Sequence, residues 1–139
     1  MSNGLDVALM KDPDGPWAPE RGDHHLAIAF GDDEWGSFFF DTLGAATEPS
    51  IQGEPYMVFE IRRRHVFQQS LPDYPLLGRI HAFYQDASFA ADEISGLQKE
   101  LRRAEKLVIA PKARSFLHGM LEATEQARRL DMGICLLSS

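Results

Sequence analysis

The chain has 139 residues, of which 44% are hydrophobic and 25% are charged, and its formal net charge at pH 7 is −7. This length and composition are typical of one soluble domain, residues 1–139, that buries its own core. A single cysteine excludes an internal disulfide and fits a reducing compartment. Neither a signal-peptide pattern nor an apolar run of about 20 residues is present, so we expect a cytoplasmic protein that does not bind membranes.

The charge is divided unevenly along the chain. Residues 1–60 contain twelve acidic and two basic residues, a net charge of −10, whereas residues 61–139 contain twelve basic and nine acidic residues, a net charge of +3. An acidic half repels phosphate, which argues against nucleic acid as a direct partner and favours a basic protein. The alternative is a solvated acidic face that only keeps the protein soluble.

The N-terminal half contains loops and short apolar runs. Residues 11–23, KDPDGPWAPERGD, predict a loop because of their prolines and glycines. Residues 25–31 alternate large and small side chains and predict a strand, in which Ala27 and Ala29 would form a small face that a helix could approach. The aromatic run at residues 38–40 fits a buried strand or a short helix equally well.

Two further strands are predicted in the middle of the chain. Residues 56–61, YMVFEI, are rich in β-branched and aromatic side chains and alternate between two faces. Residues 78–84, GRIHAFY, follow a proline-containing loop and give the same prediction.

The last fifty residues predict a helical hairpin. Ser88 precedes a helical pattern that extends to residues 107–108 and buries one apolar stripe. Pro111 ends this helix or starts the next one, which reaches Leu130, and Gly133 is a typical stop after a helix. Residues 134–137 can add a final short strand.

These elements predict an α+β fold. Each helix has one apolar stripe that a sheet or another helix must cover. We therefore expect a mostly antiparallel sheet with a C-terminal helical hairpin packed on one face and a final short strand. The order of the strands is left open.

Two adjacent histidines suggest a metal site, but their arrangement argues against one. His24 and His25 are adjacent, and neighbouring side chains on an extended segment point to opposite faces, so the two are poorly placed to share an ion. Other ligands would have to come from distant residues such as Asp32, His65 or His81. No glycine-rich phosphate loop is present. We expect neither a metal nor a cofactor.

A small enzyme or ligand-binding domain is the alternative function. His81, Tyr84 and the nearby Asp86 could support acid–base chemistry, and Arg62 and Arg64 would project together from a strand and could clamp an anion. No serine or cysteine nucleophile lies in a strained-turn motif, so strand residues that lead into a helix are the simpler interpretation. This alternative requires a pocket in which these groups converge.

Three segments of the C-terminal half resemble bacterial immunity proteins of polymorphic toxin and contact-dependent inhibition systems: IHAFYQDASF, DEISGLQKEL and SFLHGMLEATEQA. The resemblance covers about residues 78–139. Proteins of these families are small, acidic and cytoplasmic, are often α+β, and lack catalytic residues. The resemblance therefore implies a protein that binds and neutralises a toxin.

Charge and resemblance lead to the same hypothesis, a non-enzymatic acidic protein that neutralises a basic toxin domain. Acidic side chains would steer onto the positive surface of the partner, and tryptophans that are exposed would anchor the contact. The alternative for Trp17 and Trp35 is that either side chain folds back onto the core. A homodimeric accessory protein, joined through a sheet edge or an apolar helix face, remains a further alternative, and the oligomeric state is open. The predicted contact residues are Asp12, Asp14, Trp17, Glu20, Asp23, Asp32, Asp33, Glu34 and Trp35.

Overall fold

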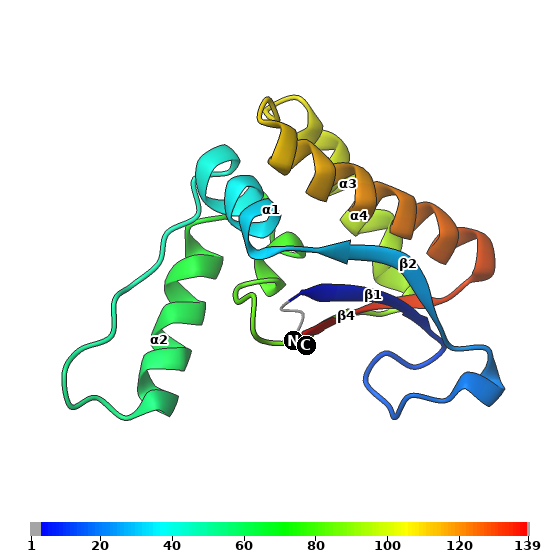
Figure 1. Ribbon diagram of the computed structural model, residues 1–139, viewed down its shortest axis with the longest axis horizontal. Helices are drawn as coiled ribbons and strands as arrows, with labels where there is room; N and C mark the ends of the chain where they lie inside the picture. Colours follow the sequence, from blue (N-terminus) through cyan, green and yellow to red (C-terminus); the bar gives the residue numbers. More distant parts are fainter. Residues whose placement is uncertain (1–3, 139) are drawn as a thin grey trace.

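The computed structural model describes residues 4–138 and has an α+β fold (Figure 1). Four strands form one antiparallel sheet in the order β2-β1-β4-β3. The strands are β1 (Leu5–Met10), β2 (His24–Phe30), β3 (Ala87–Phe89) and β4 (Gly133–Ser138). The helices are α1 (Asp32–Gly36), α2 (Tyr56–Gln69), α3 (Ile94–Glu105) and α4 (Pro111–Leu130). The expected antiparallel sheet, helical hairpin and final strand are confirmed.

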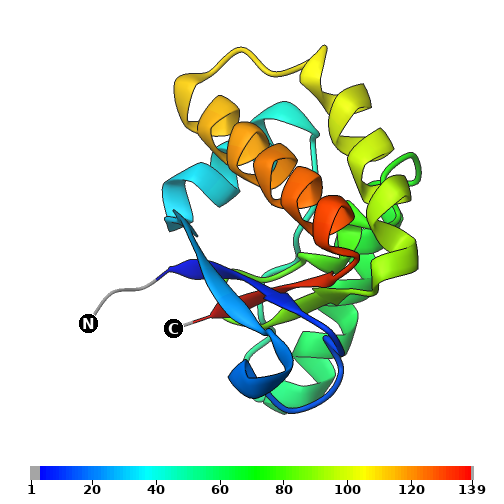
Figure 2. The same cartoon turned by 90° about the vertical axis from the view of Figure 1, so that its right-hand side faces the viewer.

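Helices α3 and α4 cover one face of the sheet (Figure 2). Ile94, Leu97 and Leu101 of α3 are fully or almost fully buried, as the apolar stripe predicted. The helix ends at Glu105 rather than at residues 107–108, and Leu107 is exposed in the turn between the helices. Ser88 lies within β3, where it does not precede the helix directly; a 3-10 turn at Ala91–Glu93 separates the two.

The N-terminal strand β1 occupies the centre of the sheet, although the sequence pattern did not predict it. It pairs with β2 on one side and with β4 on the other. Leu5, Val7 and Leu9 face the helices and have no exposed surface. Because side chains alternate along a strand, Asp6 and Ala8 belong to the opposite face.

The strand prediction for residues 56–61 is wrong, because these residues begin the 14-residue helix α2. Six residues of alternating hydrophobicity are too few to distinguish the two periods. The following residues, RRRHVFQQ, contain no proline or glycine and let the helix continue. In the helix, Phe59 is half-buried whereas Met57 and Ile61 are exposed.

The strand prediction for residues 78–84 is also wrong. Leu77–Arg79 form a 3-10 turn, and the backbone after it is irregular up to β3. Four consecutive side chains, at residues 80–83, are buried there, so no exposed face alternates with a buried one. The indole Nε1 of Trp35 donates a hydrogen bond of 2.9 Å to the carbonyl oxygen of Ile80 and fixes this segment to α1.

The aromatic run at residues 38–40 is helical, which decides between the two interpretations. It belongs to a π-helical segment, Ser37–Thr42, that continues from α1. Phe38 and Phe39 are fully buried, and their rings lie 4.8 Å and 5.5 Å from the ring of Phe116 on α4. The wider π-helical turn thus places two successive aromatic rings in one core.

The strand prediction for residues 25–31 is confirmed by β2, but its faces are the reverse of those expected. Ala27 and Ala29 are exposed, and α4 packs instead on the side that carries Ile28 and Phe30. The close approach depends on Gly119 of α4, since a Cβ at this position would lie 2.5 Å from Cε1 of Phe30.

Replacing Gly119 with alanine should destabilise the fold by about 1–3 kcal/mol, because the Phe30 ring is held against Phe116 and cannot move aside. Gly36→Ala is the matched control. A Cβ at Gly36 would meet only Phe40 at 3.9 Å, so alanine should stabilise the helix by up to about 1 kcal/mol. Urea unfolding monitored by circular dichroism measures the stability of both variants. Equal midpoints for the two variants would contradict the close packing of Gly119 on Phe30.

Candidate protein-binding surface

The loop between β1 and β2, residues 11–23, is held in a defined shape by Asp23. The side chain of Asp23 is only 3% exposed. Its carboxylate accepts hydrogen bonds from the backbone amides of Lys11, at 2.8 Å, and Ala18, at 2.9 Å. Both bonds lower the pKa of Asp23 below its ordinary value, and the bond from the Lys11 amide has the larger effect. Asp23, one of the predicted contact residues, therefore closes the loop internally, and its carboxylate is not presented to solvent.

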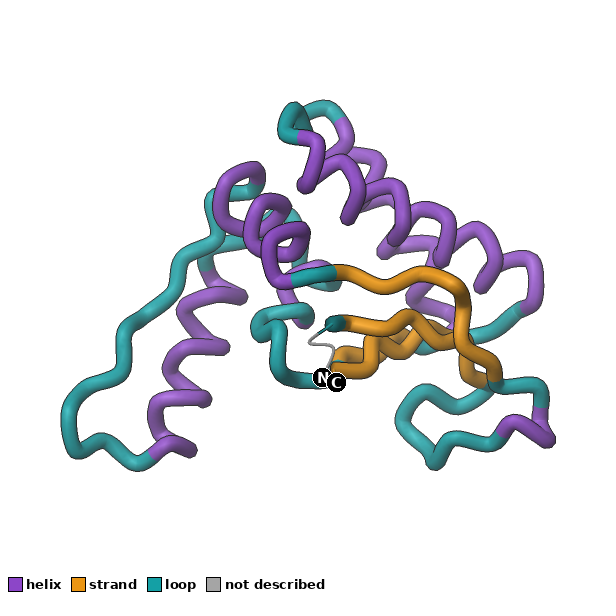
Figure 3. Tube along the Cα trace, viewed as in Figure 1, coloured by secondary structure: helices purple, strands orange, loops and turns teal. Residues whose placement is uncertain are grey.

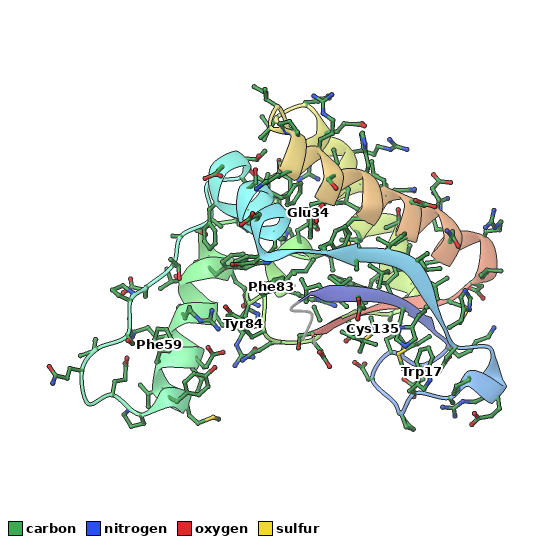
Figure 4. All side chains as sticks on the ribbon, viewed as in Figure 1. Trp17, Glu34, Phe59, Phe83, Tyr84 and Cys135 are labelled. Carbon is green, nitrogen blue, oxygen red and sulfur yellow. The ribbon has the colours of Figure 1, made fainter. Side chains whose placement is uncertain are left out.

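We call residues 11–23 the acidic loop, because three of its four acidic side chains, those of Asp12, Asp14 and Glu20, are exposed. Trp17 is 39% exposed, and its ring centroid lies 4.5 Å from that of His25. Figure 4 shows Trp17 beneath the sheet, near the loop end of β2. The acidic loop thus presents carboxylates and one aromatic side chain to solvent.

The acidic loop packs closely against the sheet face that the helices leave uncovered. A Cβ at Gly133 of β4 would lie 2.2 Å from Cγ of Pro13, so the loop reaches its position only over a glycine. Cys135, on the same face of β4, is almost fully buried, and burial raises the pKa of its thiol to about 11, with Asp86 and Asp14 adding to the effect. Burial therefore disfavours the thiolate form of Cys135.

Residues 32–35 lie at the other end of β2, where three of the four take part in internal contacts. Asp33 forms an ion pair of 2.7 Å with Lys112 of α4, whose hydrogen bond lowers the pKa of Asp33. Glu34 accepts hydrogen bonds from the Gly31 amide, at 3.1 Å, and from the hydroxyl of Ser115. The residues that form these contacts line an open hollow of about 600 Å³ between α1 and α4. Asp32 remains exposed.

Trp35, predicted as an interface anchor, belongs to the core. It is 7% exposed, and its ring stacks almost parallel to that of Phe67 at a centroid distance of 6.3 Å. Its Nε1 donates to Ile80. Both ends of the indole are therefore satisfied inside the protein.

The predicted contact residues do not form one surface. The two acidic groups are separated by the length of β2, which has seven residues and so spans about 20 Å. Figure 4 places Trp17 and Glu34 far apart, beside different elements. Asp12, Asp14, Trp17 and Glu20 lie in one loop and are exposed, whereas Asp32 and Asp33 are exposed at the other end of β2. The sequence could not show this, because residues 23–32 are neighbours along the chain but lie at opposite ends of a strand.

The residues of the alternative enzyme hypothesis have different environments. His81 is buried, whereas Tyr84 is 72% exposed. Arg62 forms ion pairs with Glu48, at 2.9 Å, and with Glu54, at 2.8 Å. Its guanidinium is thus bound to two carboxylates of the loop that precedes α2, which leaves it little capacity to clamp an anion.

The histidines of β2 have separate contacts as well. Nδ1 of His24 lies 3.1 Å from the carbonyl oxygen of Gly22, and His25 packs on Trp17. Within residues 4–138, no three His, Cys, Asp or Glu side chains are grouped so that they could hold a metal ion.

Helix α2 carries exposed apolar side chains that the sequence interpretation missed. Met57, Val58 and Ile61 are 70%, 51% and 57% exposed, and their i, i+3 and i+4 spacing places them on one face. Figure 3 shows α2 after a long loop and away from the sheet. The strand prediction concealed this face, because in a strand Met57 and Ile61 would have pointed inward together with Phe59.

Asp23→Asn should loosen the acidic loop. The charged carboxylate accepts stronger hydrogen bonds than an amide oxygen. Because the pKa of Asp23 is lowered on folding, the charged carboxylate stabilises the folded state at neutral pH. This contribution to the free energy of unfolding is lost as the pH falls below 3.8, the ordinary pKa of the group. We expect a lower melting temperature at pH 7, with the difference from the natural chain vanishing in strong acid. An unchanged difference at acid pH would contradict this role.

Comparisons with protein-family models, with curated proteins and with solved structures found no match. Among the described helices, none combines the length and the apolar character needed to cross a bilayer. The residues and their geometry are thus the basis for a functional proposal.

Proposed function

We propose that this chain is a non-enzymatic binding protein that docks its acidic loop onto a basic protein surface, as an immunity protein would do to neutralise a toxin. The observation that carries the proposal is the rigid display of Asp12, Asp14, Trp17 and Glu20 by a loop that Asp23 holds closed. The specific role in toxin neutralisation comes from the resemblance of residues 78–139.

Preorganisation supports this choice of surface. A loop that is already fixed loses little conformational freedom on binding, so more of the contact energy appears as affinity. The loop is fixed at both ends by the sheet and internally by the bonds to Lys11 and Ala18. Gly15 donates a further backbone bond of 3.0 Å to Asp12 and forms a tight turn there.

Charge and shape then select the partner. Exposed carboxylates attract a positive surface and accelerate the encounter. Trp17 offers a large apolar side chain of the kind that dominates interface energies. Among the acids near α4, Asp33 is paired with a cation, Lys112, whereas Asp12 and Asp14 accept hydrogen bonds only from uncharged donors, the Asp14 amide and the Ser88 hydroxyl.

The test is a pull-down from native lysate at low salt, followed by titration of each captured basic protein against matched variants. Neutralising the acidic loop by Asp12→Asn, Asp14→Asn and Glu20→Gln should weaken binding at least about tenfold and flatten its salt dependence. The control removes the same three charges elsewhere, at Asp32, Asp41 and Asp92, all of which are exposed. Equal effects of the two triple variants would refute the proposed surface.

Trp17→Ala provides an independent check. If Trp17 is an anchor, the substitution should weaken binding by about 2 kcal/mol with little change in the salt dependence. Calorimetric titration with the captured protein measures both. Unchanged affinity would show that the aromatic side chain lies outside the contact.

Self-association is a second candidate function, and the exposed apolar face of α2 favours it. Contiguous apolar surface on a monomer is commonly an interaction site, and a second copy of the chain could cover Met57, Val58 and Ile61 by packing helix against helix. Light scattering during size exclusion would then report a dimer that Ile61→Glu converts to monomer. Gln68→Glu, which adds the same charge at an exposed polar position of α2, should leave the dimer intact.

A further inference from the structure

The turn between α3 and α4, residues 106–110, exposes two aliphatic side chains, and we call it the hairpin tip. Ile109 is 84% exposed, more than any other large apolar side chain in the described part of the chain, and Leu107 is 52% exposed. Val108, which lies between them, is buried. The hairpin tip thus anchors one aliphatic side chain in the core and directs its two neighbours into solvent.

The hairpin tip is an ordered, projecting turn. The Leu107 amide donates a hydrogen bond of 2.9 Å to the carbonyl oxygen of Ala104, and Pro111 begins α4 directly after the turn. Both helices pack against each other, and Figures 1 and 2 show the turn that joins them at the top of the molecule. The exposed pair is therefore held in place from both sides.

The hairpin tip lies within the most basic segment of the chain. Residues 102–114, RRAEKLVIAPKAR, contain five basic residues and one acidic residue, a net charge of +4 in a chain whose net charge is −7. Two of the five cations have carboxylate partners, since Arg102 lies 3.5 Å from Glu105 and Lys112 lies 2.7 Å from Asp33. The cations that form no ion pair within residues 4–138 are Arg103, Lys106 and Arg114.

The acidic loop does not cancel this charge, because it lies at the opposite end of α4. The helix runs from Pro111 at the hairpin tip for 20 residues, about 30 Å, to Leu130. Gly133, just beyond it, lies against Pro13 of the acidic loop. The Debye length at physiological ionic strength is about 8 Å, so exposed charges this far apart are screened from each other.

The acidic side chains of α1 lie closer to the hairpin tip than the acidic loop does. They face Pro111 and Lys112 across the hollow between α1 and α4. Asp33 among them is paired with Lys112, and the group lowers the positive potential on that side.

Two aliphatic side chains on a narrow projecting turn suit a lipid bilayer better than a folded protein. A stable protein interface covers about 800 Å² on each partner, an area that a five-residue turn does not supply. A bilayer needs no matching shape. Aliphatic side chains enter its headgroup–acyl boundary, and each Lys or Arg near an anionic surface raises the affinity about fivefold. The unpaired cations beside the turn therefore select an anionic bilayer as the occupant.

We propose that the hairpin tip is a peripheral membrane contact: Leu107 and Ile109 insert into the headgroup–acyl boundary of an anionic bilayer, and Arg103, Lys106 and Arg114 bind its headgroups. Two inserted side chains give weak, reversible binding. The sequence-based expectation that the protein does not bind membranes considered a signal peptide and a membrane-spanning run, and a surface contact needs neither. This inference goes beyond the proposed protein-binding function, because the acidic loop at the other end of α4 stays free.

The test is co-sedimentation of the whole chain with vesicles of phosphatidylcholine, either alone or with about 30% phosphatidylserine. Binding to the anionic vesicles should be at least about tenfold tighter and should weaken as salt is raised. Leu107→Ser combined with Ile109→Ser should lower the affinity at least about tenfold. The matched control, Leu130→Ser combined with Ile51→Ser, removes the same two side-chain types at exposed positions away from the hairpin tip and should bind as the natural chain does.

A second pair of variants tests the charges. Lys106→Gln combined with Arg114→Gln should weaken binding to anionic vesicles at least about tenfold and flatten its salt dependence. Lys11→Gln combined with Arg129→Gln removes the same two charges from exposed positions at the acidic-loop end of the molecule. This control should change the affinity little.

Three outcomes would overturn the proposal: no binding to anionic vesicles, equal binding to both kinds of vesicle, or equal effects of the hairpin-tip and control variants. Titration with poly-glutamate examines the other class of partner. Binding of this acidic polypeptide through the hairpin tip, without binding to vesicles, would make the tip a protein-binding surface and refute the membrane contact. All substituted side chains are exposed, so each variant should retain the circular dichroism spectrum of the natural chain.

Discussion

The contact between α4 and the edge strand β2 is the interaction on which the rest of the structure depends. Gly119 lets the ring of Phe30 approach α4, and one turn earlier Phe116 lies within 4.5–5.5 Å of the rings of Phe30, Phe38 and Phe39. Each aromatic pair contributes about 0.5–1.5 kcal/mol beyond the burial of its surface. One helix thus fixes both the sheet and the π-helical segment after α1.

This packing also divides the acidic residues into two groups with different roles. Near α4, Asp33 forms an exposed ion pair with Lys112, and Glu34 accepts a hydrogen bond from Ser115. At the other end of β2 the buried carboxylate of Asp23 closes the acidic loop through backbone amides, and Asp12, Asp14 and Glu20 remain exposed, with Asp14 accepting a hydrogen bond of 3.0 Å from the Ser88 hydroxyl.

Helix α2 differs from the other long helices because its apolar residues are mostly outside. It is held by the packing of Phe67 on Trp35 and by the hydrogen bond that Glu60 accepts from Gln85. The molecule therefore combines a rigid sheet-and-hairpin body with one weakly attached helix.

The sequence alone determined the helical hairpin, strand β2 and the final strand, because helical periodicity repeats over 12 and 20 residues in α3 and α4 and leaves little ambiguity. Short runs were undetermined: residues 56–61 fit both periods, and residues 80–83 are buried all round. Tertiary structure decided these cases and placed β1 at the centre of the sheet. It also separated acidic residues that lie close together in the sequence, because the two ends of a strand are far apart. Loops return such residues to the body of the protein only where their side chains find hydrogen-bond partners.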